Sequence, residues 1–368
     1  MKSTARSAAV ITTITATVAG LVAATGVLAP SASASTTFIG PLRHTAVVAS
    51  TIPANGDVNP YGVAVIPRSA GDLHRSDVLV SNFNDKANVQ GTGTTVVQVS
   101  PQGRATLFAH VTDRACPGGV GLTTALVALR GGWVIVGSLP TRNGVISGPG
   151  CLIVLDQWGH VRETIAGHGI TGPWDMTALD RGNVTELFVT NVLGGILGRH
   201  NPDGGTVQRL LITSAANRTP RVLASTTIGS GFPARTDPNA LVIGPTGVGL
   251  SRNGTLYVAD TLSNRIAAIP GATSRRGDDG RGRTVSKGGA LVGQLGLATA
   301  PNGNILTVNG GNGNMVETTP NGAQVAVRTV DKNAGGAGNL FGLAVKPGAD
   351  AVYFVDDFSA ANNLQLLF

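Results

Sequence analysis

Short apolar runs that alternate with polar residues and end in glycine-rich turns recur along this chain. The clearest example spans residues 246–269, where Val248 and Leu250 alternate with glycine and serine at the period of two of a half-buried strand. Asn253-Gly254 supplies a tight turn, because this pair accepts positive φ at low cost. A second apolar run, Leu256-Tyr257-Val258, and a third strand follow. The segment therefore predicts most of one antiparallel blade.

Imperfect copies of the first strand of this pattern recur at intervals that suit four-stranded blades with loops of variable length. The six copies are Tyr61–Val65, Val120–Leu122, Trp174–Met176, Thr246–Leu250, Leu295–Ala298 and Phe341–Val345. Each copy is followed by a second β-prone run. The repeats predict an all-β fold, a six-bladed β-propeller of four-stranded antiparallel blades.

Two repeats depart from the pattern in ways that affect the ring. In the fourth, an arginine-rich loop at residues 275–287 stands where the outer hairpin is expected. The sixth runs out of chain before its fourth strand. We expect Thr45–Ser50 to pair with Leu364–Phe368, so that the N-terminal and C-terminal strands close the ring without an open edge.

Residues 1–34 have the pattern of a secretory signal peptide. Lys2 and Arg6 form a short basic region, residues 8–28 are small and apolar, and Ala32-Ser33-Ala34 is a cleavage motif. The alternative is an uncleaved membrane anchor, which the many threonine and alanine residues disfavour. We therefore expect a secreted monomer whose single domain covers residues 35–368, with no membrane span after cleavage.

The charge of the chain does not alter the prediction of a secreted propeller. The formal net charge is +7, or +7 − 2 = +5 without Lys2 and Arg6. The only basic cluster, at residues 275–287, is interleaved with glycine and aspartate, which is typical of a solvated loop. We expect no nucleic-acid partner, because the cluster lacks interleaved aromatic residues and the chain carries an export signal.

The fourth repeat carries a family resemblance. Its segments Pro245-Thr246-Gly247-Val248, Gly254-Thr255-Leu256-Tyr257-Val258-Ala259-Asp260-Thr261 and Asn264-Arg265-Ile266 resemble the NHL repeat, and residues 301–309 are a weaker copy. The resemblance implies a six-bladed propeller of the secreted bacterial type and, more distantly, similarity to the gluconolactonase and senescence-marker propellers. It implies little about chemistry, since similar propellers serve as binding platforms, lactonases and lyases.

Cys116 and Cys151 are the only cysteines. In an exported chain such a pair favours a disulfide over two free thiols, and a cysteine metal site would need more ligands. Cys116 precedes the first strand of the second blade, and Cys151 follows the loop after its second strand. Both therefore lie on the same face of the propeller. The bridge would stabilise the fold by about 3–4 kcal/mol in the chain-entropy model.

The ends of the second strands carry polar residues at one alignment position. These residues are Asn82, Ser138, Asn191, Asp260, Asn309 and Asp356. In a radial arrangement they approach the central channel on one face, which we call the loop-rich face. Converging oxygen atoms there can bind a hard cation such as Ca²⁺. The alternative is structural, because Asn and Asp at strand ends hydrogen-bond to local backbone.

Other residues on the loop-rich face depart from the repeat. Asp175 replaces the glycine that the other copies place before an apolar residue, and Trp174 precedes it. His110 and His168 lie in loops that we expect on the same face. Together with the polar strand ends, these side chains are candidates for a ligand pocket.

Three kinds of enzyme site make different demands on these residues. A lactonase of the gluconolactonase type needs oxygen ligands around one divalent ion, for which the candidates are Asp175, Asn191, Asp260 and Asn309, although no glutamate aligns with them. An NHL-type amidating lyase uses several histidines on zinc, and here only two share the face. A serine hydrolase lacks support, because no G-x-S-x-G motif is present.

The leading hypothesis from the sequence is an extracellular module that binds a small molecule, a polymer or a protein through the loop-rich face. The alternative is a metal-dependent, lactonase-like hydrolase or a lyase with its site at the central channel. A purely structural cell-surface protein is the third possibility.

Overall fold

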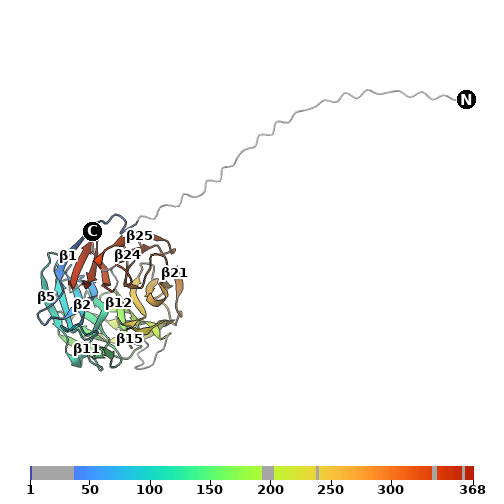
Figure 1. Ribbon diagram of the computed structural model, residues 1–368. Coiled ribbons are helices and arrows are strands. Elements are labelled where there is room, and N and C mark those ends of the chain that lie inside the picture. The colour runs from blue at the N-terminus through green and yellow to red at the C-terminus, as the bar shows by residue number, and fades with distance from the viewer. Residues whose placement is uncertain (2–36, 193–202, 238–239, 334–337, 359–360) are drawn as a thin grey trace. The chain divides into compact units, whose positions relative to one another are not determined.

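The computed structural model describes Met1 and residues 37–192, 203–237, 240–333, 338–358 and 361–368. The chain divides into two compact units, Met1–Ala34 and Ser35–Phe368, of which the second is described here. Its described residues form six four-stranded antiparallel sheets and no α-helix. The sheets are arranged in a ring, with β2 and β12 nearer the centre and β5, β11, β15 and β21 at the rim (Figure 1). The predicted six-bladed propeller is confirmed.

Each of the first three blades runs outward from an innermost strand in chain order. Blade 1 consists of β2 (Val58–Val65), β3 (Val78–Asn84), β4 (Thr95–Val99) and β5 (Ala105–His110). Blade 2 consists of β6 (Leu122–Ala128), β7 (Val134–Ser138), β10 (Cys151–Leu155) and β11 (Val161–Ile165). Blade 3 consists of β12 (Pro173–Asp180), β13 (Val184–Asn191), β14 (Gly205–Thr213) and β15 (Val222–Phe232).

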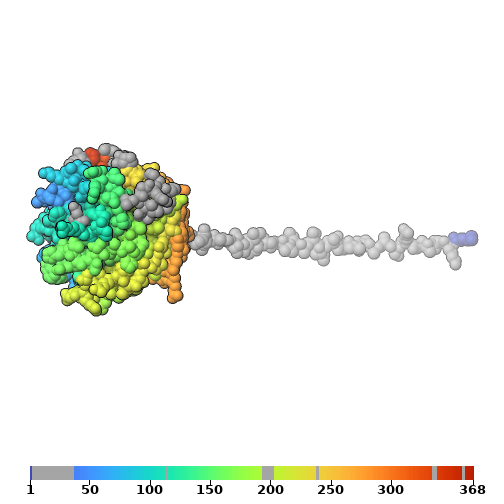
Figure 2. Space-filling model, turned by 90° about the horizontal axis from the view of Figure 1, so that it is seen from below, coloured from blue at the N-terminus to red at the C-terminus, as the bar shows by residue number. Residues whose placement is uncertain are grey.

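The next two blades repeat this order. Blade 4 consists of β18 (Pro245–Leu250), β19 (Leu256–Asp260), β20 (Arg265–Ile269) and β21 (Arg283–Lys287). Blade 5 consists of β22 (Gln294–Thr299), β23 (Ile305–Asn309), β24 (Asn314–Thr318) and β25 (Gln324–Thr329). Seen from the side, the green surface of blades 2 and 3 continues into the yellow surface of blade 4 (Figure 2).

Blade 6 is completed by both ends of the unit. It consists of β26 (Leu340–Val345), β27 (Val352–Asp356), β28 (Asn363–Leu367) and β1 (Thr45–Ser50). Strand β1 pairs antiparallel with β28, with Thr45 opposite Leu367 and Ser50 opposite Asn363. Because the outermost strand comes from the N-terminal end, backbone hydrogen bonds close the ring as predicted.

A buried carboxylate extends this closure to blade 5. Glu317 on β24 is fully buried and accepts hydrogen bonds from the backbone N–H groups of Phe38 and Ile39, at 2.7 and 2.8 Å. The side-chain amide of Asn304 donates to the same carboxylate at 2.7 Å. The segment that leads into β1 is thereby fixed to the blade beside the one it completes.

Short elements lie in the connections between strands. They are the hairpin of β8 (Thr141–Arg142) and β9 (Val145–Ile146), the hairpin of β16 (Arg235–Asp237) and β17 (Leu241–Ile243), and the 3₁₀ turns η1 (Asp113–Ala115) and η3 (Thr261–Ser263). In the part of the chain that the structure describes, no helix is long and apolar enough to cross a bilayer.

The disulfide between Cys116 and Cys151 is present, and both residues are buried. Cys151 is the first residue of β10, and Cys116 follows the 3₁₀ turn η1. Their Cα atoms lie 5.9 Å apart. The bridge thus ties the segment before the first strand of blade 2 to its third strand, as predicted from the alignment of the repeats.

Two details of the predicted repeats are wrong. In blade 2 the sequence pattern predicts the copy at Val120–Leu122, but Leu122 lies opposite Ser138 as Pro60 lies opposite Asn82, so the counterpart of Tyr61-Gly62-Val63 is Thr124-Ala125-Leu126. In blade 4 the arginine-rich residues do not replace the outer hairpin. They lie largely in the connection between β20 and β21, which pair with each other.

Candidate functional site

The first strands of all blades interrupt their pairing at one level of the channel. In each strand a register shift precedes the residue where regular pairing with the second strand resumes. The residues directly before that point are Gly62, Ala125, Asp175, Gly247, Gly296 and Gly342. Asp175 is the one member of this ring whose side chain is larger than a methyl group.

Glycine predominates at this level because the first strand of the next blade passes very close. A Cβ atom at Gly342 would lie 2.1 Å from the carbonyl oxygen of Tyr61, and one at Gly296 would lie 2.2 Å from that of Phe341. These separations are far below van der Waals contact. The two positions of this ring that carry a side chain are Ala125 in blade 2 and Asp175 in blade 3.

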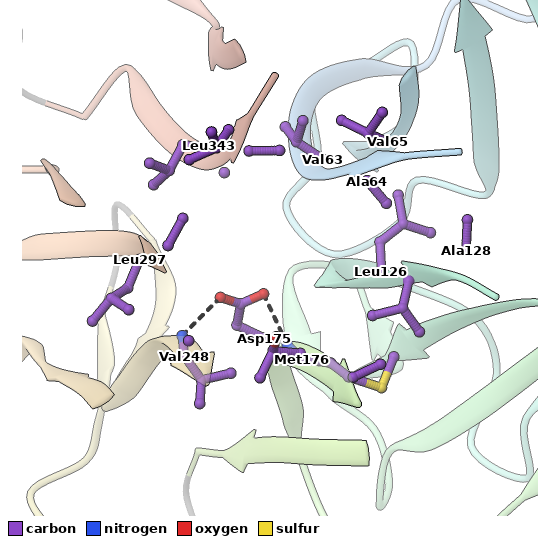
Figure 3. A pocket seen from close by; sticks show the side chains of 18 of the residues that line it. Val63, Ala64, Val65, Leu126, Ala128, Asp175, Met176, Val248, Leu297 and Leu343 are labelled. Carbon is purple, nitrogen blue, oxygen red and sulfur yellow. Dashed lines mark hydrogen bonds between the residues drawn. The ribbon is translucent and has the colours of Figure 1, made fainter. Parts of the chain in front are cut away.

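The carboxyl group of Asp175 joins blades 3 and 4. The backbone N–H of Val248, on β18, donates to Oδ2 at 3.1 Å, and that of Met176 donates to Oδ1 at 2.8 Å (Figure 3). The hydroxyl of Thr190 accepts from the backbone N–H of Asp175 at 3.1 Å and donates to the carbonyl of Thr246 at 2.7 Å. The orientation of the carboxyl group is therefore fixed from both blades.

A cavity of about 500 Å³ occupies the axis of the ring on one side of this level. The first strands of all blades line it, and aliphatic or thioether side chains from each face it (Figure 3). One from each blade is Val63, Leu126, Met176, Val248, Leu297 and Leu343. Among the described lining residues, the ionisable ones are Asp175, Arg130 and Asp180.

These three ionisable residues lie at different depths. Asp175 is buried, whereas Arg130 is exposed and Asp180 is partly exposed at the ends of the first strands. The backbone N–H of Arg130 donates to the carboxylate of Asp180 at 2.6 Å. The cavity therefore has a charged mouth, a wall where aliphatic side chains and polar atoms are both exposed, and one carboxyl group at its inner end.

Burial raises the pKa of Asp175 from its ordinary value of 3.8 to about 7, while the N–H groups of Met176 and Val248 act in the opposite direction. The cause is loss of hydration, which disfavours the ionised form. Near neutral pH the carboxyl group is thus populated both with and without its proton. It can donate a hydrogen bond in one form and accept a proton in the other.

The opposite end of the channel, on the loop-rich face, is filled by aromatic side chains. Tyr61 stacks on Phe83 and Phe341 with ring centroids 4.2 and 4.0 Å away, and Trp174 contacts Tyr61 edge-on at 5.9 Å. Blades 1 and 3 are not neighbours, so the contact between Tyr61 and Trp174 spans the axis. Residues of β17, including Leu241, pack on the same cluster. Trp174 is therefore a core residue that closes the channel, and the cavity opens on the face opposite to the predicted one.

The strand pairing confirms the alignment of the six polar strand ends. Asn82 lies opposite Pro60 and Asp356 opposite Leu340, and the other four occupy the same position in their blades. Their side chains, however, do not line the cavity. Of the residues that the sequence placed in a channel site, only Asp175 reaches this space.

The hydrogen bonds of these strand ends are local. Asn82 donates to the carbonyl of Thr51 at 3.0 Å, and Asn309 donates to that of Ala290 at 2.8 Å. The side-chain oxygen of Asn191 accepts from the N–H of Thr171 at 3.0 Å. These contacts fit the structural alternative, in which the side chain fixes the loops that flank its own strand.

Both acidic strand ends are also engaged locally. Asp260 is fully buried and forms ion pairs with Arg265 and Arg281 at 2.8 and 3.0 Å. Asp356 accepts from the backbone N–H of Phe358 at 2.9 Å, and burial raises its pKa. The arginine-rich loop thus has a structural contact, because Arg281 reaches back to the end of β19.

The two candidate histidines lie at the surface. His110 is the last residue of β5, at the outer edge of blade 1, and is exposed. His168 is exposed in the turn after β11 and has a φ of 52°. Neither lines the cavity.

The predicted metal ligands do not form a site in this structure. Within the described ranges, no group of three or more His, Cys, Asp or Glu side chains is placed to hold a metal ion. Asp175 bonds to backbone N–H groups, Asp260 bonds to arginines, and Asn191 and Asn309 bond to the loops that lead into their blades. The structure therefore shows no metal site at these four residues, and Oδ1 of Asp260 and Oδ1 of Asn309 are buried without a hydrogen-bond partner.

The cavity itself was not predicted, although the sequence contains a signal for it. The residues that follow the ring of apolar side chains by one position are small or short in most blades. They are Ala64, Val127, Thr177, Gly249, Ala298 and Ala344, and all of them line the cavity. Small side chains at this level leave the axis open toward the turns between first and second strands.

No known protein family matches the sequence in a comparison with family models, and no curated protein matches it. Solved structures with the same architecture do match. A gluconolactonase from Xanthomonas campestris has a TM-score of 0.56 at 12% identity, with 88% of each chain covered. Regucalcin, a calcium-binding protein from Agrobacterium tumefaciens, has a TM-score of 0.54 at 14% identity over 86% of this chain and 92% of the other. At these identities the likeness shows the fold.

A third similar structure belongs to a different class of enzyme. It is a catalytically inactive variant of virginiamycin B lyase from Staphylococcus aureus with quinupristin. Its TM-score is 0.51 at 12% identity, with 88% of this chain and 100% of the other covered. The same propeller architecture therefore occurs in proteins described as a gluconolactonase, a calcium-binding protein and a lyase.

Proposed function

We propose that the central cavity is the functional site and that it binds a small, mostly apolar molecule through the carboxyl group of Asp175. The observation that carries this proposal is one buried ionisable group at the inner end of an aliphatic cavity of about 500 Å³. Apolar pockets with a few well-placed polar groups are the usual form of small-molecule sites.

The cavity favours a ligand with an apolar body and one terminal hydrogen-bond donor or amine. The aliphatic wall gains from burial of apolar ligand surface, at roughly 25 cal/mol per Å². Each oxygen of Asp175 accepts one backbone N–H and keeps further acceptor capacity. A cationic amine would favour the ionised carboxylate, whereas a neutral carbonyl would favour the protonated form.

We also propose that the chain is exported and meets this ligand outside the cell. The pattern of residues 1–34 supports export, and the buried Cys116–Cys151 disulfide is a feature of proteins that fold in oxidising compartments.

An apolar amine tests the binding proposal. Calorimetric titration with cyclohexylamine should show binding that strengthens between about pH 6 and pH 8 as Asp175 ionises. Asp175→Asn should weaken it by at least about tenfold, because the buried countercharge is lost. Asp180→Asn, which removes a carboxylate at the mouth of the cavity, should bind cyclohexylamine as wild type does. Absence of binding, or equal binding by the Asp175 variant, contradicts the proposal.

The second candidate is an enzyme of the lactonase or lyase type that uses the same cavity. It is favoured by the pKa of Asp175, since a carboxyl group with a pKa near the working pH is suited to general acid–base catalysis. The descriptions of the gluconolactonase and lyase propellers support the same candidate. In this version Asp175 would exchange a proton with the substrate at the inner end of the cavity.

Proton release during hydrolysis of δ-gluconolactone, with and without added Ca²⁺, tests the hydrolase version. The expected result is turnover above the spontaneous rate, with an inflection of the rate near the pKa of Asp175 and loss of turnover in Asp175→Asn. Equal rates for wild type and variant would exclude Asp175 as the acid–base group.

A further inference from the structure

A second cleft lies outside the central cavity, at the turns of blade 2. Its volume is about 220 Å³, and its lining continues from the mouth of the cavity, since Arg130 belongs to the cavity and Gly131 to the cleft. The side chains that give it character are Trp133, Gln157, Trp158, Arg162, Asn217 and Thr219. An indole surface is thus surrounded by amide, hydroxyl and guanidinium groups and by the carboxylate of Asp156, which pairs with Arg162.

Trp158 is the exposed tryptophan of this chain. Its exposed fraction is 49%, compared with 7% for Trp133 and 4% for Trp174. A large aromatic surface in water carries a free-energy cost that a bound ligand removes. Trp133 forms part of the wall and donates its Nε1–H to the carbonyl of Ala215 at 3.0 Å, which leaves Trp158 as the available ring.

The turn that carries Trp158 is held rigidly. Oδ1 of Asp156 accepts from the backbone N–H groups of Trp158 and His160 at 2.9 and 3.0 Å, and its Oδ2 accepts from Nε of Arg162 at 2.6 Å. Gly159 adopts a φ of 78°, which completes the turn. The same interactions of Asp156 fix the backbone beneath the indole and the guanidinium group of Arg162.

The neighbouring blade supports this turn from behind. The carbonyl of Gln157 accepts from the N–H of Asp72 at 2.9 Å. A Cβ atom at Gly159 would lie 2.0 Å from the carbonyl oxygen of Phe108, so the turn lies directly against the outer strand of blade 1. A rigid aromatic surface loses little conformational entropy when a ligand binds.

A larger, cationic cleft adjoins the first. Its volume is about 570 Å³, it shares Thr219 with the first cleft, and its lining includes Arg218 and Arg221. The side chains of these two arginines form no ion pair with another described residue. Guanidinium groups bind carboxylates through paired hydrogen bonds.

We infer that the two clefts together bind an acidic oligosaccharide. A pyranose ring has one flat face of C–H groups that can stack on the indole of Trp158, and equatorial hydroxyls that suit the groups of Gln157, Arg162 and Asn217. A carboxylate on the next sugar unit would lie in the adjoining cleft beside Arg218 and Arg221. A single exposed indole does not provide the succession of stacking rings that single-stranded nucleic acids require. This site is independent of the cavity around Asp175.

Titration with a panel of acidic hexasaccharides tests the inference. The probes are hexamers of galacturonate, mannuronate and hyaluronan, with maltohexaose and cellohexaose as neutral counterparts and a thymidine hexanucleotide as a nucleic-acid probe. We expect at least one acidic hexamer to bind and to quench tryptophan fluorescence. Its affinity should exceed that of the neutral hexamers by at least about tenfold.

Variants of the cleft distinguish the roles of its side chains. Trp158→Ala should lower the affinity by at least about tenfold, and Trp158→Phe should lose less. Arg218→Gln with Arg221→Gln should weaken binding and reduce its dependence on salt. Arg276→Gln, at an exposed site outside both clefts, is the matched control and should bind like wild type, as should Asp175→Asn.

Four results would overturn the inference. They are no binding by any acidic hexamer at millimolar concentration, wild-type affinity in Trp158→Ala, equal affinity for acidic and neutral hexamers, and preference for the hexanucleotide. Because Trp158 is exposed, its variants should fold normally, which circular dichroism can verify. Failure of cyclohexylamine to bind would leave this result unaffected, since Asp175 does not contribute to the clefts.

Discussion

The two ends of the central channel are built from the same first strands, yet one end is filled and the other is hollow. At the loop-rich end the strands of blades 1, 3 and 6 carry Tyr61, Trp174 and Phe341, whose rings meet across the axis. A few residues further along, the same strands carry Ala64, Thr177 and Ala344, and the axis is open. Side-chain volume at two levels of one strand decides which face of the propeller is open to a ligand.

The boundary between the two ends lies at the ring of glycines. There the strands approach so closely that four of the six positions accept only glycine without a shift of the neighbouring blade. Asp175 occupies the equivalent position of blade 3, and its carboxyl group accepts a hydrogen bond from the backbone of Val248 in blade 4. The polar group thus belongs to the framework of the ring and to the wall of the cavity at once.

Both ends of the channel depend on closure of the ring, because blade 6 forms part of the wall at each end. Deletion of residues 364–368 removes most of β28, and with it the pairing to β1 and to β27. Loss of the hydrogen bonds and packing of this strand should cost more than the net stability of about 5–15 kcal/mol that is typical of a domain. We expect the truncated protein to lack a cooperative thermal transition in circular dichroism. Phe368→Ala, which shortens a half-exposed side chain, is the control, and a truncated protein with wild-type melting temperature would contradict the closed ring.

The packing of the aromatic end of the channel can be tested separately from ring closure. Trp174→Ala removes a buried indole from the aromatic cluster and should lower the free energy of unfolding by about 3–5 kcal/mol. Trp158→Ala removes an exposed indole and should change it by less than about 0.5 kcal/mol. Urea titration measures both values on the same protein. Equal losses would mean that Trp174 does not close the channel in the way described.

The fold could be predicted from the sequence because it depends on local patterns. Alternation of apolar residues, Asn-Gly turns and the spacing of copies each report on nearby residues, and six repeats reinforce one another. The pairing of Thr45–Ser50 with Leu364–Phe368 followed from counting strands. The copy in blade 2 was misplaced because Gly121 precedes an apolar residue as Gly62 does, whereas the structural counterpart of Gly62 is Ala125.

The position of the open site could not be predicted in the same way. Trp174 and Asp175 are adjacent in sequence, and both depart from the repeat, so they were assigned to the same face. The two residues differ in their contacts, because Trp174 packs against the aromatic rings of Tyr61 and Phe83 in blade 1, whereas Asp175 accepts a hydrogen bond from a backbone N–H of blade 4. These are contacts between residues far apart in sequence. The cleft beside Trp158 likewise depends on residues far apart in sequence, since Asn217 and Thr219 line it together with Trp158.

The hollow end has its own signature, a dependence of stability on pH. The folded state holds the proton of Asp175 more tightly than the unfolded chain does, because burial raises its pKa from 3.8 to about 7. The contribution of Asp175 to the free energy of unfolding is fully present below the unfolded pKa of 3.8. It is lost as the pH rises through the folded pKa of about 7. Between pH 5 and pH 8 this group alone should lower the free energy of unfolding by about 2–3 kcal/mol.

Asp175→Asn should remove this component of the pH dependence, at a pH-independent cost of about 1 kcal/mol because its amide N–H₂ faces one backbone N–H. Asp357 is the matched comparison, since burial and the neighbouring Asp356 and Asp331 also raise its pKa to about 7. Asp357→Asn should remove a similar slope and leave cyclohexylamine binding unchanged. Urea titrations at several pH values measure both slopes. If wild type and Asp175→Asn lose stability in parallel, the carboxyl group at the inner end of the cavity is hydrated and ionised at neutral pH, and the contrast between the two ends of the channel is one of shape alone.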